Sequence, residues 1–257
     1  MDKASIGGVI LAVVGIVAGL LMEGGNIGQI LQPTAAIIVF GGTMGAVLLQ
    51  FPLTTVVAAF GGMAHIFAAP QVQDYQVIGQ LVGFAHKARH SGVVSLDDDL
   101  KAISDPFLKQ TLMLAVDGTE PAELRKIMHV NLDSTQEREE RLPAVFESAG
   151  GFSPTIGILG AVLGLIQVMQ HLDNISEVGR GIAVAFVATI YGVGIANLFF
   201  LPSAGKMRIR IRDEQRRREM MLEGVIGILE GMNPRMLELK LACFAEETNS
   251  AQKEETL

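Results

Sequence analysis

The apolar positions of this chain fall into four long stretches that are arranged in two pairs. The stretches contain no Asp, Glu, Lys or Arg, and they cover residues 5–22, 33–51, 153–170 and 181–201. Each is roughly 18–21 residues long, so at about 1.5 Å per helical residue each can cross a bilayer. Because lipid offers no partner to free backbone groups, stretches of this length should be helices. The pattern predicts an all-α integral membrane protein with four transmembrane helices and a helical cytoplasmic domain.

A charged block separates the two pairs, and a second charged segment follows the last stretch. Apolar residues at helical spacing predict helices near 75–90, 106–116 and 121–146, and another over 206–230 that Gly231 to Pro234 should end. The expected domains are a first transmembrane hairpin (1–52), a cytoplasmic helical domain (53–150), a second transmembrane hairpin (151–203), and a cytoplasmic C-terminal helix and tail (204–257).

The basic residues indicate the orientation in the membrane. Of the 20 Lys and Arg residues, 8 lie in 52–150 and 10 lie in 203–257, whereas Arg180 alone lies in a connection on the other side. Positive charge accumulates on the cytoplasmic side of membrane proteins, so both termini and both charged segments are expected in the cytoplasm of a bacterial inner membrane. The connections 23–32 and 171–180 are too short to hold an external domain.

The composition argues against several classes of protein. The net charge of −7 and the acidic excess in the charged block do not suggest nucleic-acid binding. The chain has no CxxC, HExxH or P-loop motif, its five His residues are scattered, and the single Cys243 has no partner in the chain. We therefore expect neither an enzyme nor a bound metal or cofactor.

Small residues recur at a spacing of four in three of the apolar stretches. The glycine pairs 15/19, 41/45 and 160/164 each lie on one helix face, where they let two membrane helices approach closely. Such contacts could lie within the chain or between subunits. No ionisable residue lies inside a stretch, although a protein that moves ions normally carries one in the pathway. Either a second chain supplies the ion carrier or nothing is transported.

Five segments resemble one known family. They are Ser153–Gln167, Gly181–Gly192, Ala196–Pro202, Met113–Gly118 and Leu222–Pro234. The chain resembles the MotA family of flagellar motor stator subunits, within the MotA/TolQ/ExbB proton channel superfamily, over almost its whole length. The related ExbB and TolQ proteins have three spans and an external amino terminus, so four spans favour the MotA side.

This resemblance implies a motor function and a set of partners. Five copies would form a ring around two copies of a MotB-like single-span protein that carries the missing aspartate and is anchored to peptidoglycan. Inward proton flow would turn the ring and drive a FliG-like rotor protein. Surrounding lipid would be the other contact, with no cofactor and no nucleic acid.

The resemblance also assigns roles to particular residues. Pro154 and Pro202 match two prolines thought to couple ion passage to cytoplasmic movement. Thr189 matches a threonine that lines the ion path, and Ala161 stands where sodium-driven members carry threonine, so the implied ion is the proton rather than sodium. Arg89 and Asp97 match the charged pair that faces the rotor, although the family has Glu at the position of Asp97.

Two other functions remain open. One is an ExbB/TolQ-like energiser that couples proton flow to a different envelope process. The other is a structural membrane scaffold that conducts nothing.

Overall fold

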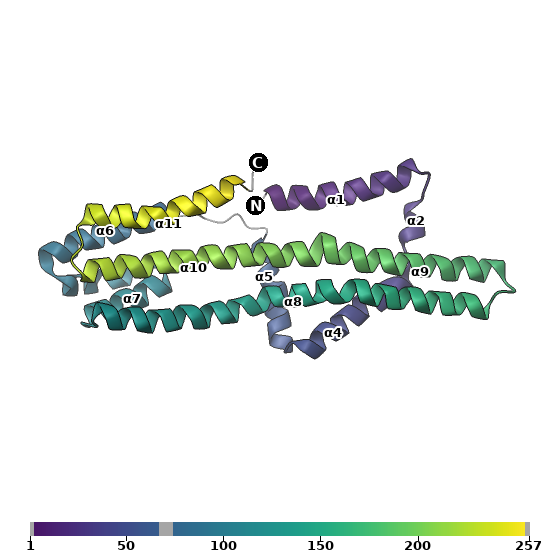
Figure 1. Cartoon of the computed structure of the whole chain (residues 1–257), viewed down its shortest axis with the longest axis horizontal. Helices are drawn as coiled ribbons and strands as arrows, with labels where there is room; N and C mark the ends of the chain where they lie inside the picture. The colour runs from purple at the N-terminus through teal and green to yellow at the C-terminus, as the bar shows by residue number, and fades with distance from the viewer. Residues whose placement is uncertain (1–2, 67–73, 255–257) are drawn as a thin grey trace. The chain divides into compact units, whose positions relative to one another are not determined.

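The computed structural model describes residues 3–66 and 74–254, and all the regular structure in these residues is helical (Figure 1). The described residues form two compact units that alternate along the sequence. We call Met1–Pro70 with Glu140–Arg208 the apolar unit, and Gln71–Glu139 with Ile209–Leu257 the polar unit. Each unit is described by itself.

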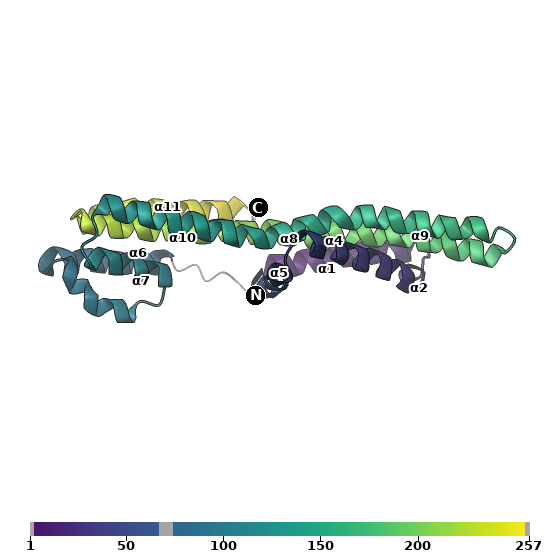
Figure 2. The ribbon, with the colours of Figure 1, turned by 90° about the horizontal axis from the view of Figure 1, so that it is seen from below.

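The apolar unit contains the long hydrophobic helices. Its elements are α1 (Lys3–Met22), α2 (Ile27–Ile30), α3 (Pro33–Ala36), the π-helical turn η1 (Ile37–Gly41), α4 (Gly42–Gln50), α5 (Leu53–Ile66), the second part of α8 (Pro121–Gln170), α9 (Ile175–Ile195), the π-helical turn η3 (Ala196–Phe200) and the start of α10 (Leu201–Leu229). Figure 2 shows α8 and α9 side by side over the length of α9.

Three described helices are long and apolar enough to cross a membrane: Pro33–Gln50, Pro121–Gln170 and Ile175–Leu229. The first predicted span corresponds to α1, whose apolar part, Ile6–Met22, is slightly shorter. The helix over Pro33–Gln50 includes η1, since a π turn widens the helix locally without ending it.

One expected boundary between elements is wrong, because the helix predicted near 121–146 and the third span form the single helix α8. The fourth span continues through η3 into α10, as the helix expected after it requires. Hydropathy changes sharply at these points, but nothing there stops the helix. Gly150 lies within α8 and packs against Leu201, since an added Cβ would lie 2.6 Å from Leu201 Cδ2.

The polar unit contains α6 (Asp74–Ser91), the 3₁₀ helix η2 (Val93–Ala102), α7 (Pro106–Val116), the first part of α8, the second part of α10, and α11 (Pro234–Glu254). Asp105 caps α7, because its carboxylate accepts hydrogen bonds of 2.9 Å from the backbone N–H groups of Phe107 and Leu108. Gly231, at φ 71°, follows the end of α10 as expected. The segment expected to be a tail forms α11, which packs against α6.

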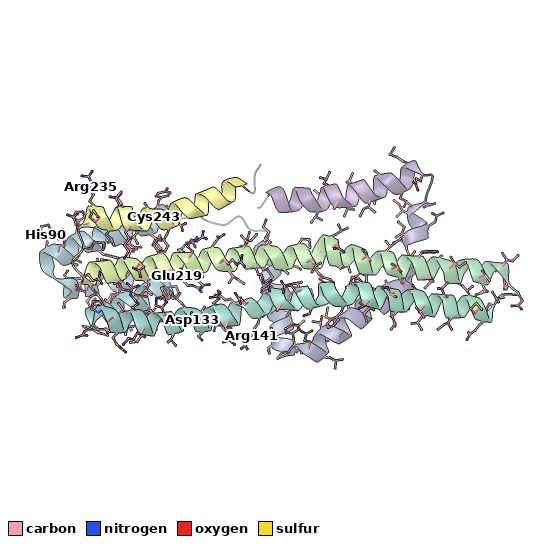
Figure 3. All side chains as sticks on the ribbon, viewed as in Figure 1. His90, Asp133, Arg141, Glu219, Arg235 and Cys243 are labelled. Carbon is pink, nitrogen blue, oxygen red and sulfur yellow. The ribbon has the colours of Figure 1, made fainter. Side chains whose placement is uncertain are left out.

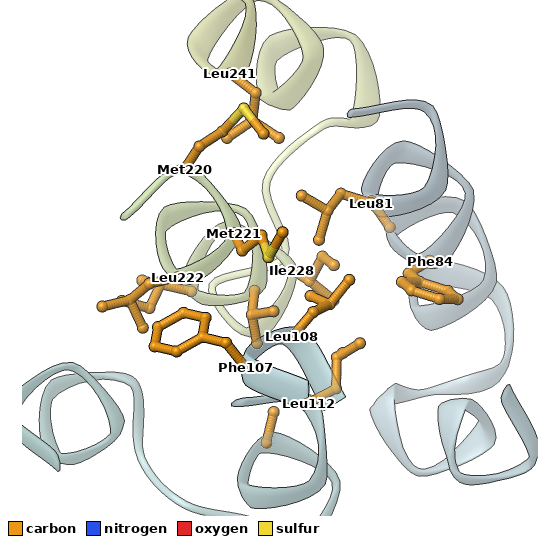
Figure 4. Packing of buried hydrophobic residues seen from close by; sticks show 14 of the residues in the cluster. Leu81, Phe84, Phe107, Leu108, Leu112, Met220, Met221, Leu222, Ile228 and Leu241 are labelled. Carbon is orange, nitrogen blue, oxygen red and sulfur yellow. The ribbon is translucent and has the colours of Figure 1, made fainter. Parts of the chain in front are cut away.

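One hydrophobic core holds the polar unit together (Figure 4). Leu81 of α6, Leu112 of α7 and Met221 of α10 are at most 1% exposed and lie in this core. Leu241 packs from α11 near Met220. Residues of α6, η2, α7, α8, α10 and α11 thus share one core, which positions the charged outer faces of α6 and η2.

Candidate functional site

The helices α8 and α9 are in direct backbone contact. A Cβ added at Gly192 would lie 2.4 Å from the carbonyl oxygen of Ser153, and one added at Gly164 would lie 2.9 Å from that of Gly181. Such contacts are possible only with glycine. The 160/164 pair is therefore used for packing within the chain.

The glycine pairs of the first two spans are placed differently. An added Cβ at Gly15, Gly19, Gly41 or Gly45 would meet nothing within 4 Å. These faces of α1 and of the second span are not covered by other described parts of the chain, so they are accessible to another subunit.

Thr189 and Ala161 lie beside the α8–α9 contact. A Cβ at Gly160 would lie 2.9 Å from that of Ala188, and the two candidate ion-path residues directly follow these two residues in sequence. Both are half-buried, and Thr189 Oγ1 donates to the carbonyl oxygen of Ala185 at 3.3 Å. The structure thus brings the two residues to one level of the helix pair.

Further polar side chains on these helices are exposed. Thr155 Oγ1 donates to the carbonyl of Phe152 at 2.8 Å, and Asn197 Nδ2 donates to that of Val193 at 2.9 Å. Hydroxyl and amide groups can contact a hydrated ion, but they do not ionise at physiological pH. Among the described residues, the apolar segments 153–170 and 181–201 therefore have no charged side chain of their own for proton or ion transfer.

Pro154 and Pro202 both lie inside continuous helical segments. Pro154 is in α8, and Pro202 follows η3 as the second residue of α10. Each ring lacks a backbone N–H and so removes one hydrogen bond from its helix. The prolines therefore do not mark helix ends, and the Gly150–Leu201 contact links the two regions.

Tyr191 makes a connection within the apolar unit that the sequence did not indicate. Its hydroxyl donates to the carbonyl of Ile30 at 2.6 Å and accepts from the backbone N–H of Gln32 at 3.3 Å. These bonds fasten the turn between α2 and α3 to α9. A tyrosine inside an apolar stretch was the only signal in the sequence, and its partners are about 160 residues away.

Arg89 and Asp97 are both exposed on the polar unit. Arg89 lies in the last turn of α6, Asp97 lies in η2, and Gly92 turns the chain between them at φ 78°. A 2.7 Å ion pair between Lys87 and Asp99 joins the same two elements. Both candidate residues are therefore available to a partner.

The end of the polar unit that carries Arg89 has further basic groups. Figure 3 places His90, at the end of α6, and Arg235, at the start of α11, at the same end of this unit. Arg235 and His90 are exposed.

Cys243 is also exposed, and its thiol donates a hydrogen bond of 3.4 Å to the carbonyl of Leu239.

Ion pairs hold the helices of the polar unit in register. Lys240 Nζ lies 2.6 Å from Glu223 Oε2, and Arg125 binds the same carboxylate through two nitrogens. Burial alone would raise the pKa of Glu223, but the hydrogen bonds from Arg125 and Lys240 outweigh it and lower the pKa. Glu223 therefore joins α10 to α8 and α11 as a carboxylate.

Another ion pair, with a buried carboxylate, lies at the start of α6. Arg217 Nε donates to Asp74 Oδ1 at 2.8 Å, and the Asp74 residue is 5% exposed. Burial lowers the pKa of Arg217, but Asp74 and Glu214 more than compensate and raise it. The pair fixes α6 to α10.

Comparison with known proteins gives the family. Residues 99–220 match the MotA/TolQ/ExbB proton channel family, and residues 6–92 match the family of the Motility protein A N-terminal region. Motility protein A of Bacillus subtilis is 34% identical over 95% of this chain and 91% of its own length. The chain belongs to the MotA family. Chemotaxis protein PomA of Vibrio alginolyticus is 29% identical over 98% of both chains.

Solved structures of MotA-family complexes have the same fold. The C. jejuni MotAB structure matches with a TM-score of 0.89 and 32% identity, covering 95% of this chain and 96% of the other. The flagellar MotAB stator complex from Bacillus subtilis matches with a TM-score of 0.88 and 33% identity over 98% and 99% of the two chains.

Proposed function

We propose that this chain is the A subunit of a flagellar stator and acts with a MotB-type partner. The observation that carries the proposal is the match over nearly the whole chain to two MotAB structures. The match includes both the apolar helices and the polar unit. Membrane-spanning helices and the family both indicate the bacterial inner membrane, and the distribution of basic residues supports cytoplasmic termini.

The partner supplies the group that this chain lacks. Exposed Thr155 and Asn197 and half-buried Thr189, on α8 and on the α9–η3 segment, carry no charge. A carboxylate on the MotB-type helix therefore takes up and releases the ion beside them. Five A subunits surround two such partners. The glycine faces of α1 and the second span, open in the single chain, suit contacts between A subunits.

Ion flow supplies the energy for rotation. A unit charge that falls through 100 mV releases about 2.3 kcal/mol, several times the thermal energy. Each step shifts α8 and α9 relative to the partner, and Pro154 and Pro202 let the helices bend. Arg89 and Asp97 transmit the movement to charged residues of a FliG-like rotor protein. Exposed charges suit this role because they orient a partner without binding it permanently.

The stator function is favoured over the ExbB/TolQ-like energiser. The shared family description covers residues 99–220 and would fit both, but residues 6–92 match the Motility protein A N-terminal region. The chain acts through movement and ion passage rather than through catalysis, and it requires no cofactor.

Stoichiometry and motility together test this proposal. The chain is co-expressed with its MotB-type partner and weighed by native mass spectrometry, and the same pair is expressed in a bacterium that lacks its own stator. We expect a complex with five A and two B subunits, and restored swimming. A 5:2 complex that restores no motility would support the energiser instead, and a chain that binds no partner would contradict both.

A further inference from the structure

A hydrogen bond between two buried hydroxyl groups joins α4 to α8 inside the apolar unit. Thr43 Oγ1 and Ser153 Oγ lie 3.2 Å apart, and the two residues are 2% and 0% exposed. An unpaired hydroxyl in an apolar environment is costly, so each group needs a partner. Here the partner lies on another helix, 110 residues away in the sequence.

Ser153 is also held from a second side. Its carbonyl oxygen touches the backbone of α9, where a Cβ at Gly192 would approach to 2.4 Å. The next residue is Pro154, which removes one hydrogen bond from α8. Ser153, the residue before Pro154, is therefore hydrogen-bonded to α4 through its side chain and packed against α9 through its backbone.

The backbone of the second span is irregular directly before Thr43. The π turn η1 ends at Gly41, and Thr43 is the second residue of α4. A π turn inserts one residue into a helix and so rotates the side chains after it relative to those before. Such turns often occur at functional sites. The turn thus helps to determine that Thr43 faces α8.

We propose that Thr43 and Ser153 are positioning residues for the movement at Pro154. Their bond ties the second membrane helix to the residue before the proline, so that α8 bends about a fixed point. This inference rests on the proposed stator function, because the movement in question is the ion-driven one. Both residues are buried, so they act through Pro154 rather than by touching the ion or the rotor.

Three variants separate the hydrogen bond from simple packing. Thr43→Val removes the hydroxyl but keeps the shape of the side chain, and Ser153→Ala removes the other hydroxyl. Thr43→Ser keeps the hydroxyl and should retain the torque of the unaltered chain. The variants are expressed with the MotB-type partner in a bacterium without its own stator, and torque per stator is measured together with the amount of partner that co-purifies.

We expect torque to fall about threefold in Thr43→Val and in Ser153→Ala, which is the change that a typical hydrogen bond between membrane helices produces in an equilibrium. The double variant should be no worse than either single one, because both remove the same bond. Co-purification of the partner should stay unchanged.

Thr111→Val is the matched control. Thr111 is also fully buried, but its hydroxyl donates to the carbonyl of Phe107 in its own helix, at 2.7 Å. This variant should keep full torque. If the unaltered chain restores no swimming, the proposed function fails; if it does, while Thr43→Val and Ser153→Ala keep full torque, the positioning role fails. The positioning role would also fail if the losses in the double variant were additive, or if Thr43→Ser lost torque. It would fail too if the variants no longer co-purified with the partner.

Discussion

Gly192 is the residue where the absence of a side chain matters most for the α8–α9 pair. A Cβ there would lie 2.4 Å from the carbonyl oxygen of Ser153 and 3.2 Å from its carbonyl carbon. These are backbone atoms, which cannot rotate away as a side-chain tip could. We expect Gly192→Ala to destabilise the apolar unit by roughly 1–3 kcal/mol, the usual range for overpacking. The melting temperature of the detergent-purified chain measures the loss.

Gly194 provides the control at the same scale. It lies on the same helix two residues away, and an added Cβ would meet nothing within 4 Å. Gly194→Ala should leave the melting temperature unchanged or raise it, because alanine favours helix by up to about 1 kcal/mol. Equal losses in both variants would mean that the close contact is not the cause.

At the scale of the elements, the sequence predicted helices where local signals were complete. Apolar spacing predicted helices near 106–116 and 75–90, and α7 and α6 lie there. The sequence did not predict that α8 is continuous, because its residues change from polar to apolar along the helix while the backbone stays helical. The contact between Thr43 and Ser153 was missed because it depends on packing between segments 110 residues apart.

The junction of α8, α10 and α11 at Glu223 makes stability depend on pH. Hydrogen bonds from Arg125 and Lys240 lower the pKa of Glu223 in the folded state below the ordinary 4.5. The unfolded chain therefore binds the proton more readily. The stabilisation is complete above pH ~4.5 and is lost as the pH falls through the folded pKa. Melting temperatures of the purified chain between pH 7 and pH 3 should show this loss.

Substitution of the carboxylate should remove that pH dependence. We expect Glu223→Gln to destabilise the polar unit by about 1–3 kcal/mol at pH 7, since it leaves two partly buried cations without a charged partner. Glu123→Gln is the control, because Glu123 and Lys126 form an exposed pair at 3.3 Å, and such pairs contribute at most about 1 kcal/mol. If both variants lose stability equally on acidification, another group is responsible.

At the scale of the whole assembly, Ala161 bears on which ion is transported. A methyl group offers no oxygen to sodium, a hard cation that needs several oxygen ligands, whereas a proton needs only the carboxylate of the partner. We expect swimming driven by this chain to follow the proton gradient and to be insensitive to sodium. Ala161→Thr alone should not create sodium dependence, because one added hydroxyl beside Thr189 does not complete a ligand shell. Swimming speeds measured across sodium concentrations and external pH provide the test, and speed that tracks sodium in the unaltered chain would overturn the assignment of the proton.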